Sequence, residues 1–300
     1  MPYPTQRSLL FGRLAVLLCA LFWSTSGLFI KLIDADPFFI AGARSFIAAL
    51  TMIAARCVFM RKPFRGITLA LKTPAFWVSG VAYSATMTAF VVANKLTVSA
   101  NVILLQYSAP VWAALLSIVL LKENPRKENL IGLVLVLCGL FIIFHGSLAS
   151  ASLLGDVIAL LSGITFALNS VCMRMQKDAD PSYSLLLSNI ITAFFALPFL
   201  FAGRPSLSMP AIGAIIFMGT IQIGVASILF AYGIKRVSAF AALIIACIEP
   251  VLNPVWVFAV TGEKPGLNAI TGGLIIVFAV VLSNTLKIKG GGAGSRPRSR

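Results

Sequence analysis

Glu249 is the side chain whose type and position point most directly to chemistry. It lies twelve residues into a long apolar run, about 18 Å along a helix and near the centre of any bilayer that the run crosses. An acidic group at that depth costs about 2.5–3.5 kcal/mol to insert, so it needs a partner, a proton or water. It could bind an ammonium group or carry a proton. Alternatively, a protonated carboxyl could bond a neighbouring helix and hold a kink at Pro250.

Pro110 and Pro250 each lie in the middle of an apolar run. Proline lacks a backbone donor and leaves the carbonyl four residues back without its helical partner. We therefore expect both prolines to kink their helices and to act as hinges, and a freed carbonyl could also bind a ligand.

Arg44 is the other charged residue inside an apolar run. It lies about seven residues, or roughly 10 Å, from the outer end of that run. A long arginine side chain can extend most of that distance toward the interface. We favour this snorkelling, or a structural pair, over pairing with Glu249 or with a substrate carboxylate.

Polar and aromatic side chains also occur at mid-depth in several runs, where lipid-facing side chains would be aliphatic. Any single serine or threonine is more simply explained as a helix-packing contact. The aromatic members, together with Phe166, would suit amphipathic ligands through stacking and cation–π contacts. The candidate substrate-binding residues are Trp23, Ser24, Tyr83, Met87, Asn101, Tyr107, Thr165, Asn169, Ser227 and Glu249.

Other kinds of site chemistry lack the residues they need. His145 is the sole histidine of the sequence, so neither a His-based triad nor a multi-His metal site can form. The sequence has no phosphate-binding loop of the Walker type, which excludes ATP as the energy source. We expect no enzyme activity, no cofactor and no metal. Five cysteines without Cys-x-x-Cys spacing are interpreted as small buried hydrophobes: Cys19, Cys57, Cys138, Cys172 and Cys247.

The composition shows where these residues must lie. Hydrophobic residues make up 59% of the 300 residues and charged ones 11%, against roughly 25% charged in soluble proteins. The mean hydropathy is +0.97. A formal charge of +15 could suggest nucleic acid, but the basic residues form short clusters between apolar runs. The lipid bilayer, and not nucleic acid, is therefore the expected partner.

Ten apolar runs are long enough to cross a bilayer as helices, which takes about 20 residues. The first, third, fourth, sixth, eighth and ninth runs carry central polar residues, whereas the fifth and tenth are nearly aliphatic and contain glycines. This division predicts a cavity lined by the polar runs and two packing helices outside it. The runs are 12–33, 37–60, 74–95, 97–121, 128–146, 153–175, 182–203, 208–231, 237–260 and 266–287.

The basic residues predict the orientation of the ten runs. Of the 24 lysines and arginines, 19 fall on the side of the N-terminus, four fall on the other side, and Arg44 lies within a run. Positive residues collect on the cytoplasmic side. We therefore expect a multi-pass protein of the bacterial cytoplasmic (inner) membrane with both termini in the cytoplasm.

The two halves of the sequence resemble each other. An offset of 140 relates Pro110, Glu123 and Pro125 to Pro250, Glu263 and Pro265, and an offset of 143 relates Gly12, Trp23 and Lys31 to Gly155, Phe166 and Arg174. Chance similarity between apolar helices is the less favoured explanation. Each half holds five runs, and because five is odd the second half must be inverted. Inverted repeats are typical of transporters with a site near the midplane.

These features predict an all-α, polytopic membrane protein with ten transmembrane helices in two inverted five-helix repeats around a central cavity. Residues 12–146 form the first repeat and 153–287 the second. Residues 1–11 are a cytoplasmic N-terminus, and 288–300 a flexible basic cytoplasmic tail. The first run lacks a clear cleavage site, so we interpret it as retained and not as a signal peptide.

With these features the sequence resembles the EamA-type branch of the drug/metabolite transporter superfamily. The resemblance rests on the two five-helix halves, on Trp23, and on runs that carry a central proline and end in glutamate; it covers about 12–287. Ala109 departs from the Glu-Pro pattern seen at Glu249 and Pro250. The resemblance implies a ten-helix fold that exports amino acids and other metabolites. Within the branch, residues 23–25 resemble the first-helix pattern of aromatic amino acid exporters of the YddG type.

The combined expectation is a secondary transporter that exports small metabolites, amino acids and above all aromatic ones, by alternating access without ATP. Uniport needs nothing more, whereas proton antiport would require Glu249 to titrate. An exporter of other amphipathic metabolites or drugs by proton antiport is the alternative. A membrane-embedded lipid-handling enzyme is disfavoured because no nucleophile or metal ligands are visible. A chain of ten helices can enclose a path alone, so no oligomer is required.

Overall fold

The computed structural model describes residues 6–31, 33–59, 64–97, 99–122, 127–145, 152–176, 179–202, 207–261 and 266–290. Within these ranges the regular structure is entirely helical and contains no strand. Glu123, Pro125, Glu263 and Pro265 of the sequence repeat lie outside the described residues.

The helices follow the predicted apolar runs. In the first half they are α1 (Gln6–Trp23), α2 (Ser26–Lys31), α3 (Pro37–Phe59), α4 (Ile67–Leu71), α5 (Pro74–Leu96), α6 (Ser99–Gln106), α7 (Ala109–Leu116), the π-helix η1 (Ser117–Leu121) and α8 (Lys127–Phe144). In the second half they are α9 (Leu153–Met175), α10 (Ser182–Phe195), α11 (Leu197–Ala202), α12 (Met209–Phe217), the π-helix η2 (Met218–Val225), α13 (Ala226–Ile234), α14 (Ala239–Ala246), α15 (Glu249–Thr261) and α16 (Leu267–Gly290).

At the two ends of the chain, helices extend beyond the predicted apolar run into polar residues. Helix α1 begins at Gln6, inside the segment predicted as an N-terminus, and α16 continues to Gly290, inside the predicted tail. Hydropathy marks where a chain is apolar, whereas good helix formers such as lysine prolong the helix itself.

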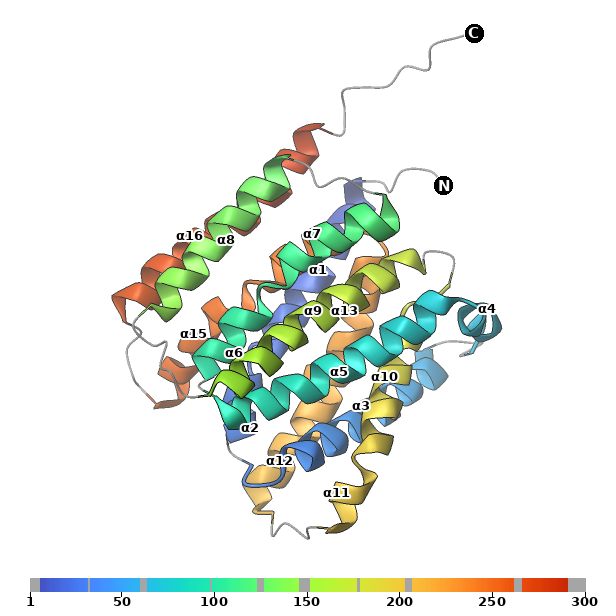
Figure 1. The fold of residues 1–300 in the computed structure, drawn as a ribbon. Coiled ribbons are helices and arrows are strands. Elements are labelled where there is room, and N and C mark those ends of the chain that lie inside the picture. The colour runs from blue at the N-terminus through green and yellow to red at the C-terminus, as the bar shows by residue number, and fades with distance from the viewer. Residues whose placement is uncertain are drawn as a thin grey trace.

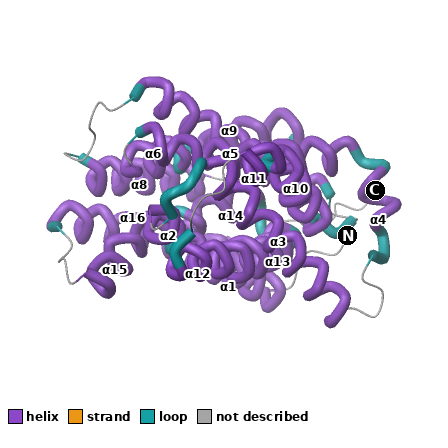
Figure 2. Tube along the Cα trace, turned by 90° about the horizontal axis from the view of Figure 1, so that it is seen from below, coloured by secondary structure: helices purple, strands orange, loops and turns teal. Residues whose placement is uncertain are grey.

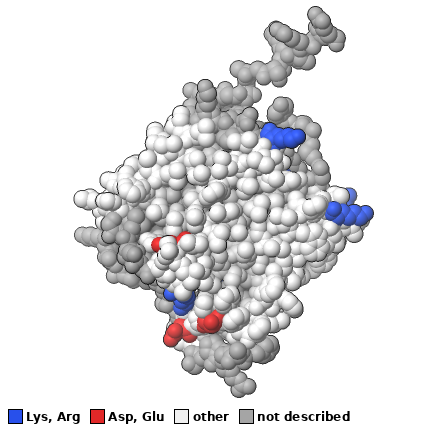
Figure 3. Space-filling view, viewed as in Figure 1, with Lys and Arg blue, Asp and Glu red and all other residues white. Residues whose placement is uncertain are grey.

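The chain is a polytopic membrane protein. Among the described residues, six helices are long and apolar enough to cross a bilayer, and four shorter apolar helices accompany them. Their outer faces carry large exposed hydrophobic side chains, such as Phe59 at 84% and Phe194 at 66% exposure. Figure 3 shows the consequence: one broad face has few charged groups, with Lys and Arg near its edges and small patches of Asp and Glu on its left and lower left.

Two of the predicted runs break just before their central proline. Helix α6 ends at Gln106 and α7 restarts at Ala109, with Pro110 in its first turn, while α14 ends at Ala246 and α15 restarts at Glu249. The breaks are tight turns, in which Ser108 N–H donates to the Leu105 carbonyl at 3.2 Å. Proline has no N–H to continue the helical ladder, so the chain restarts there as a new helix.

Helices α8 and α16 pack along each other at one side of the bundle, away from its centre (Figures 1 and 2). Gly139 allows this approach, because a Cβ built there would lie 2.6 Å from Ile276 Cγ1 and 2.8 Å from the Gly272 carbonyl oxygen. Small residues let membrane helices come this close, where van der Waals contact replaces the missing hydrophobic drive.

We expect Gly139→Val to destabilise the protein by about 1–3 kcal/mol, because the added atoms meet backbone that cannot yield. Thermal unfolding of purified protein in detergent measures the effect. Gly213→Val is the matched control, since a Cβ at Gly213 meets nothing within 4 Å. Equal melting temperatures for the two variants would contradict the tight α8–α16 contact.

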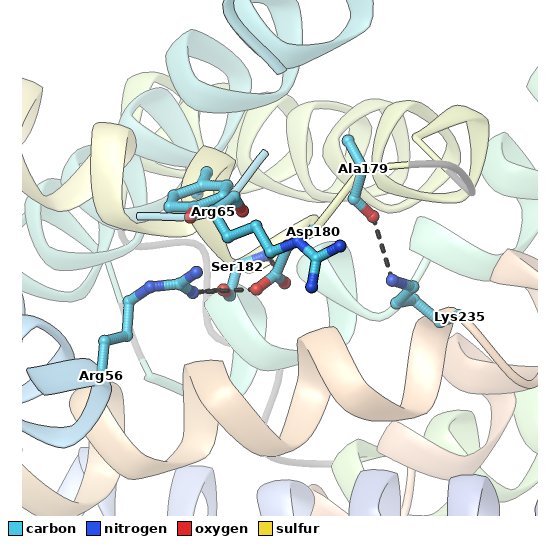
Figure 4. A network of polar contacts seen from close by, with 7 residues as sticks. Arg56, Arg65, Ala179, Asp180, Ser182 and Lys235 are labelled. Atoms are coloured by element: carbon cyan, nitrogen blue, oxygen red, sulfur yellow. Dashed lines mark hydrogen bonds and ion pairs between the residues drawn. The ribbon is translucent and has the colours of Figure 1, made fainter. Parts of the chain in front are cut away.

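A polar network at one end of the bundle joins the two halves of the chain (Figure 4). Arg56, at the end of α3, forms an ion pair with Asp180 before α10, with Nη1 and Oδ2 2.9 Å apart, and its guanidinium carbon lies 4.0 Å from the centre of the Tyr183 ring. Lys235 Nζ, after α13, donates to the Ala179 carbonyl at 3.0 Å. Burial alone would raise the pKa of Asp180, but hydrogen bonds from the Ser182 backbone and from Arg56, with the charge of Arg56, lower it.

The stability that Asp180 contributes should therefore be complete above the ordinary aspartate pKa of about 3.9 and be lost as the pH falls through the lowered folded-state pKa. We expect Asp180→Asn to melt at a lower temperature than wild type at neutral pH. The gap between the two proteins should narrow below about pH 4. Asp36→Asn, which alters an exposed carboxylate that caps α3, is the control for general acid effects. A gap that stays constant over this pH range would be evidence against the ion pair.

Candidate functional site

A cavity lies at the centre of the bundle, where both halves of the chain contribute its walls. It contains about 500 Å³ of space between atoms, counted to its open side. Helices α1, α2, α3, α5, α6 and α9, the π-helix η2 and the two helix breaks all reach it. The lining residues are Trp23, Ser26, Arg44, Tyr83, Thr86, Met87, Phe90, Gln106, Tyr107, Phe166, Gln222, Ile223 and Glu249.

Aromatic rings form one wall of this cavity. Trp23 meets Phe166 edge-on, with ring centres 5.6 Å apart, and Phe230 behind it at 5.2 Å. Tyr83 lies 6.3 Å from the Phe166 ring. Edge-to-face and tilted pairs at these distances add to the burial energy of the rings and hold them in place. The wall therefore offers a rigid apolar surface.

Glu249 faces this wall from the second helix break. It is the first residue of α15, where the positive end of the helix dipole favours a carboxylate. Tyr107, from the break between α6 and α7, donates its phenol O–H to Glu249 Oε2. The two breaks are thus joined by one side-chain hydrogen bond, and the second carboxylate oxygen keeps its own acceptor sites.

Arg44 also lines the cavity, and it does not snorkel. Its side chain is 2% exposed, and Nη2 donates to the Met87 backbone carbonyl on α5 at 3.2 Å. Its Nε has no hydrogen-bond partner among the described residues. Snorkelling was predicted from the distance along the helix to the interface. That distance does not show the direction of the side chain, which points inward between α3 and α5.

Gln222 is one of the cavity residues that are not among the predicted substrate-binding residues, the others being Ser26, Arg44, Thr86, Phe90, Gln106, Phe166 and Ile223. The Gln222 side chain is 1% exposed and lies in η2, and its Oε1 has no partner among the described residues. A π-helix turns more widely than an α-helix and commonly marks functional positions. The available signal was an amide in the middle of the apolar run 208–231.

Half of the ten predicted substrate-binding residues line the cavity: Trp23, Tyr83, Met87, Tyr107 and Glu249. The other five lie outside its walls and contact neighbouring helices. They are Ser24, Asn101, Thr165, Asn169 and Ser227.

Hydrogen bonds between helices account for four of these five. Ser24 Oγ accepts from Trp256 Nε1 at 2.7 Å. Asn101 Nδ2 donates to Asp156 Oδ1 at 3.1 Å. The Thr165 hydroxyl bonds that of Thr86 at 2.8 Å, and Asn169 Oδ1 accepts from Ser79 Oγ at 2.8 Å. Polar side chains of this kind hold membrane helices together.

The remaining side chains singled out by the sequence lie away from the cavity. Ser227 is fully buried in α13. His145 packs on Phe141 with ring centres 5.3 Å apart. Cys57 and Cys138 are exposed, which corrects the expectation that all five cysteines are buried; both lie on outer helix faces, where a thiol is apolar enough to meet lipid.

A helical membrane protein with a central cavity between two similar halves has the architecture of a membrane transporter. The sequence profile of the EamA-like transporter family matches residues 10–145 and again 153–285. The chain therefore belongs to the EamA-like transporter family, within the drug/metabolite transporter superfamily.

Individual relatives agree with this membership. A protein of Archaeoglobus fulgidus named an uncharacterized transporter is 26% identical over 281 residues, which cover 92% of this chain and 97% of the relative. The uncharacterized transporter YwfM of Bacillus subtilis is 28% identical, with 79% of this chain and 81% of the relative covered. A crystal structure of a protein 21% identical has the same fold, with a TM-score of 0.76 over 93% of this chain and 98% of the other. Family and names indicate a transporter and not an enzyme.

We expect Tyr107→Phe to destabilise the protein by about 1.5–3 kcal/mol, because it removes a hydrogen bond to a carboxylate. In a Glu249→Gln background the same change should cost less, since a neutral amide is the weaker acceptor. A double-mutant cycle of melting temperatures in detergent measures the difference. Tyr232→Phe, at a ring 42% exposed, is the control. Equal losses in both backgrounds would show that the two side chains are not coupled.

Proposed function

We propose that this protein is a secondary transporter that exports small metabolites, amino acids and above all aromatic ones, across a bacterial cytoplasmic membrane. The observation that carries the proposal is the central cavity, in which Glu249 meets a wall of aromatic rings. A carboxylate suits an ammonium group, and the rings suit a bulky side chain. In this proposal Trp23, Tyr83, Met87, Tyr107 and Glu249 contact the substrate.

The architecture proposed for this activity has ten transmembrane helices in two inverted repeats. Six long and four shorter apolar helices among the described residues support that number, since a broken or short helix can still span when its neighbours cover it. Two successive matches to one family profile support the repeat. An odd number of spans in each half would place the halves in opposite orientations, with the cavity at their junction.

The proposed orientation puts both termini in the cytoplasm. Arg236 lies beside Gly12 near the start of α1, and Arg56 and Lys235 belong to the polar network of Figure 4, whereas Asp34 and Asp36 lie between α2 and α3. This asymmetry is the one expected of the positive-inside rule.

In this proposal the two helix breaks act as the hinges of alternating access. A restart at Pro110 and another at Pro250 leave turns where half-helices can reorient without losing a full ladder of hydrogen bonds. Both breaks touch the cavity, so a change in one would alter the substrate contacts directly. Uniport requires no more than this motion, whereas proton antiport requires Glu249 to take up and release a proton.

An exporter of amphipathic drugs or other metabolites by proton antiport is the second candidate. The acidic group inside an aromatic cavity is the observation that favours it. The acid would bind the charge of a lipophilic cation, and the rings would bind its apolar part.

We expect purified protein in liposomes to take up labelled tryptophan, phenylalanine, threonine or methionine above protein-free controls. The assay is run with and without a pH gradient, for wild type, Glu249→Gln and the control Asp36→Asn, which neutralises an acid far from the cavity. Uptake that depends on the gradient and is lost only in Glu249→Gln would identify antiport with Glu249 as the proton carrier. Uptake that ignores the gradient and survives the substitution would identify uniport. If none of the four amino acids moves, the substrate proposal is wrong.

A further inference from the structure

The cavity wall contains a buried basic side chain, Arg44, as well as a half-buried acidic one, Glu249, and the two are not paired with each other. Arg44 donates to the Met87 carbonyl, and Glu249 accepts from Tyr107. No ion pair joins Arg44 to Glu249, both of which the structure describes. Each charge therefore lies in the wall of the cavity with bonding capacity left over.

Arg44 makes few hydrogen bonds for a guanidinium that is buried in a membrane protein. Its single strong contact is a neutral carbonyl, and Nε has no partner among the described residues. Arginine at this depth is costly and normally pairs with a carboxylate or lines a water-filled cavity. Other buried polar atoms, such as Ser227 Oγ and Asn189 Oδ1, also lack a partner among the described residues, but Arg44 and Gln222 are the residues of this group that line the cavity.

We propose that Arg44 binds the carboxylate of the transported molecule while Glu249 binds its ammonium group, so that the cargo is a zwitterion. This inference rests on the proposed function, because it requires the cavity to hold the cargo. It assigns a role to Arg44 and separates amino acids from the amphipathic cations that Glu249 alone would accept.

The guanidinium is suited to this role. Its planar donors match the two oxygens of a carboxylate, and such charge-assisted bonds are about twice as strong as neutral ones. Met87, which holds Arg44, lies one helical turn from Tyr83, so the cation and the aromatic wall meet on α5. The cargo's carboxylate can thus contact Arg44 while its apolar side chain lies against the rings.

The opposite charge has support of its own. Glu249 Oε2 is held by Tyr107, which orients the carboxyl and leaves acceptor sites for an ammonium. Gln222 Oε1, also in the cavity wall and without a partner among the described residues, is a further acceptor. A cation on α3 of the first half and an anion on α15 of the second mean that one zwitterion contacts both halves.

Recognition at two points predicts which analogues fail. An amine without a carboxylate would cover Arg44 and leave it unpaired, and an acid without an ammonium would do the same to Glu249. A site built for polar contacts rejects an analogue that lacks one of them far more strongly than an apolar pocket does.

Transport by proteoliposomes tests this with three matched pairs of probes: phenylalanine and 2-phenylethylamine, tryptophan and tryptamine, methionine and 3-methylthiopropylamine. Each amine lacks only the carboxylate of its partner. We expect wild type to prefer at least one amino acid over its amine by about tenfold or more in competition. 3-Phenylpropanoate, which lacks the ammonium, should compete as poorly as the amines.

Variants locate the preference at Arg44. Arg44→Gln should abolish most of the discrimination while still moving 2-phenylethylamine, and Arg44→Lys should keep part of it, because it retains the charge without the planar fork. Arg56→Gln is the matched control, since it removes an arginine from the same helix outside the cavity. It should lower the melting temperature and leave the order of substrates unchanged.

The outcomes separate this inference from the function on which it rests. If wild type moves an amine as well as its amino acid, or if Arg44→Gln keeps the wild-type preference, the assignment of Arg44 is overturned while transport stands. Loss of every probe in folded Arg44→Gln and Arg44→Lys also overturns it, in favour of a structural arginine. If wild type moves none of the probes, the proposed function fails and the inference fails with it. Should Arg44→Gln not fold, the competition pattern of wild type decides.

Discussion

The presence of a carboxylate and a guanidinium inside an apolar bundle is the constraint on which the rest of this structure depends. Neither charge can face lipid, so the helices must enclose both and supply their partners. Glu249 meets this demand by standing first in α15, where a helix dipole and the Tyr107 phenol stabilise it. The break before Pro250 is therefore more than a defect in a helix, because it creates the position that the acid needs.

The two halves share this broken helix but use it differently. At the break of the first half, Ala109 stands where the second half has Glu249, and Pro110 stands where it has Pro250. The first half contributes the phenol donor of Tyr107 and the cation of Arg44, and the second contributes the acid. Two halves that match the same family profile thus surround a cavity whose walls carry different chemistry on the two sides.

The sequence predicted the class of protein and the location of the breaks, because hydropathy and proline act locally. It also placed Tyr83, Tyr107 and Glu249 in one region, since aromatic and acidic residues at mid-depth have few other places to go. It did not predict the inward direction of Arg44, because depth along a helix says nothing about which face a side chain occupies. The sequence did not predict that Gln222 lines the cavity for a related reason, since a π-helix changes the face on which each residue lies.

Polar residues outside the cavity explain why sequence alone overestimates a binding site. Asn169 with Ser79, and Thr165 with the cavity residue Thr86, are joined by hydrogen bonds between α5 and α9. What separates the two groups is the direction of the side chain, because Asn169 and Thr165 reach a neighbouring helix while Arg44 and Gln222 line the cavity. Hydrogen bonds between helices hold the bundle together, whereas the side chains of Arg44 and Gln222 line the cavity and each has one atom without a partner among the described residues. Depth and polarity alone therefore cannot tell a helix contact from a cavity residue, because both kinds of side chain are polar and enclosed by the bundle.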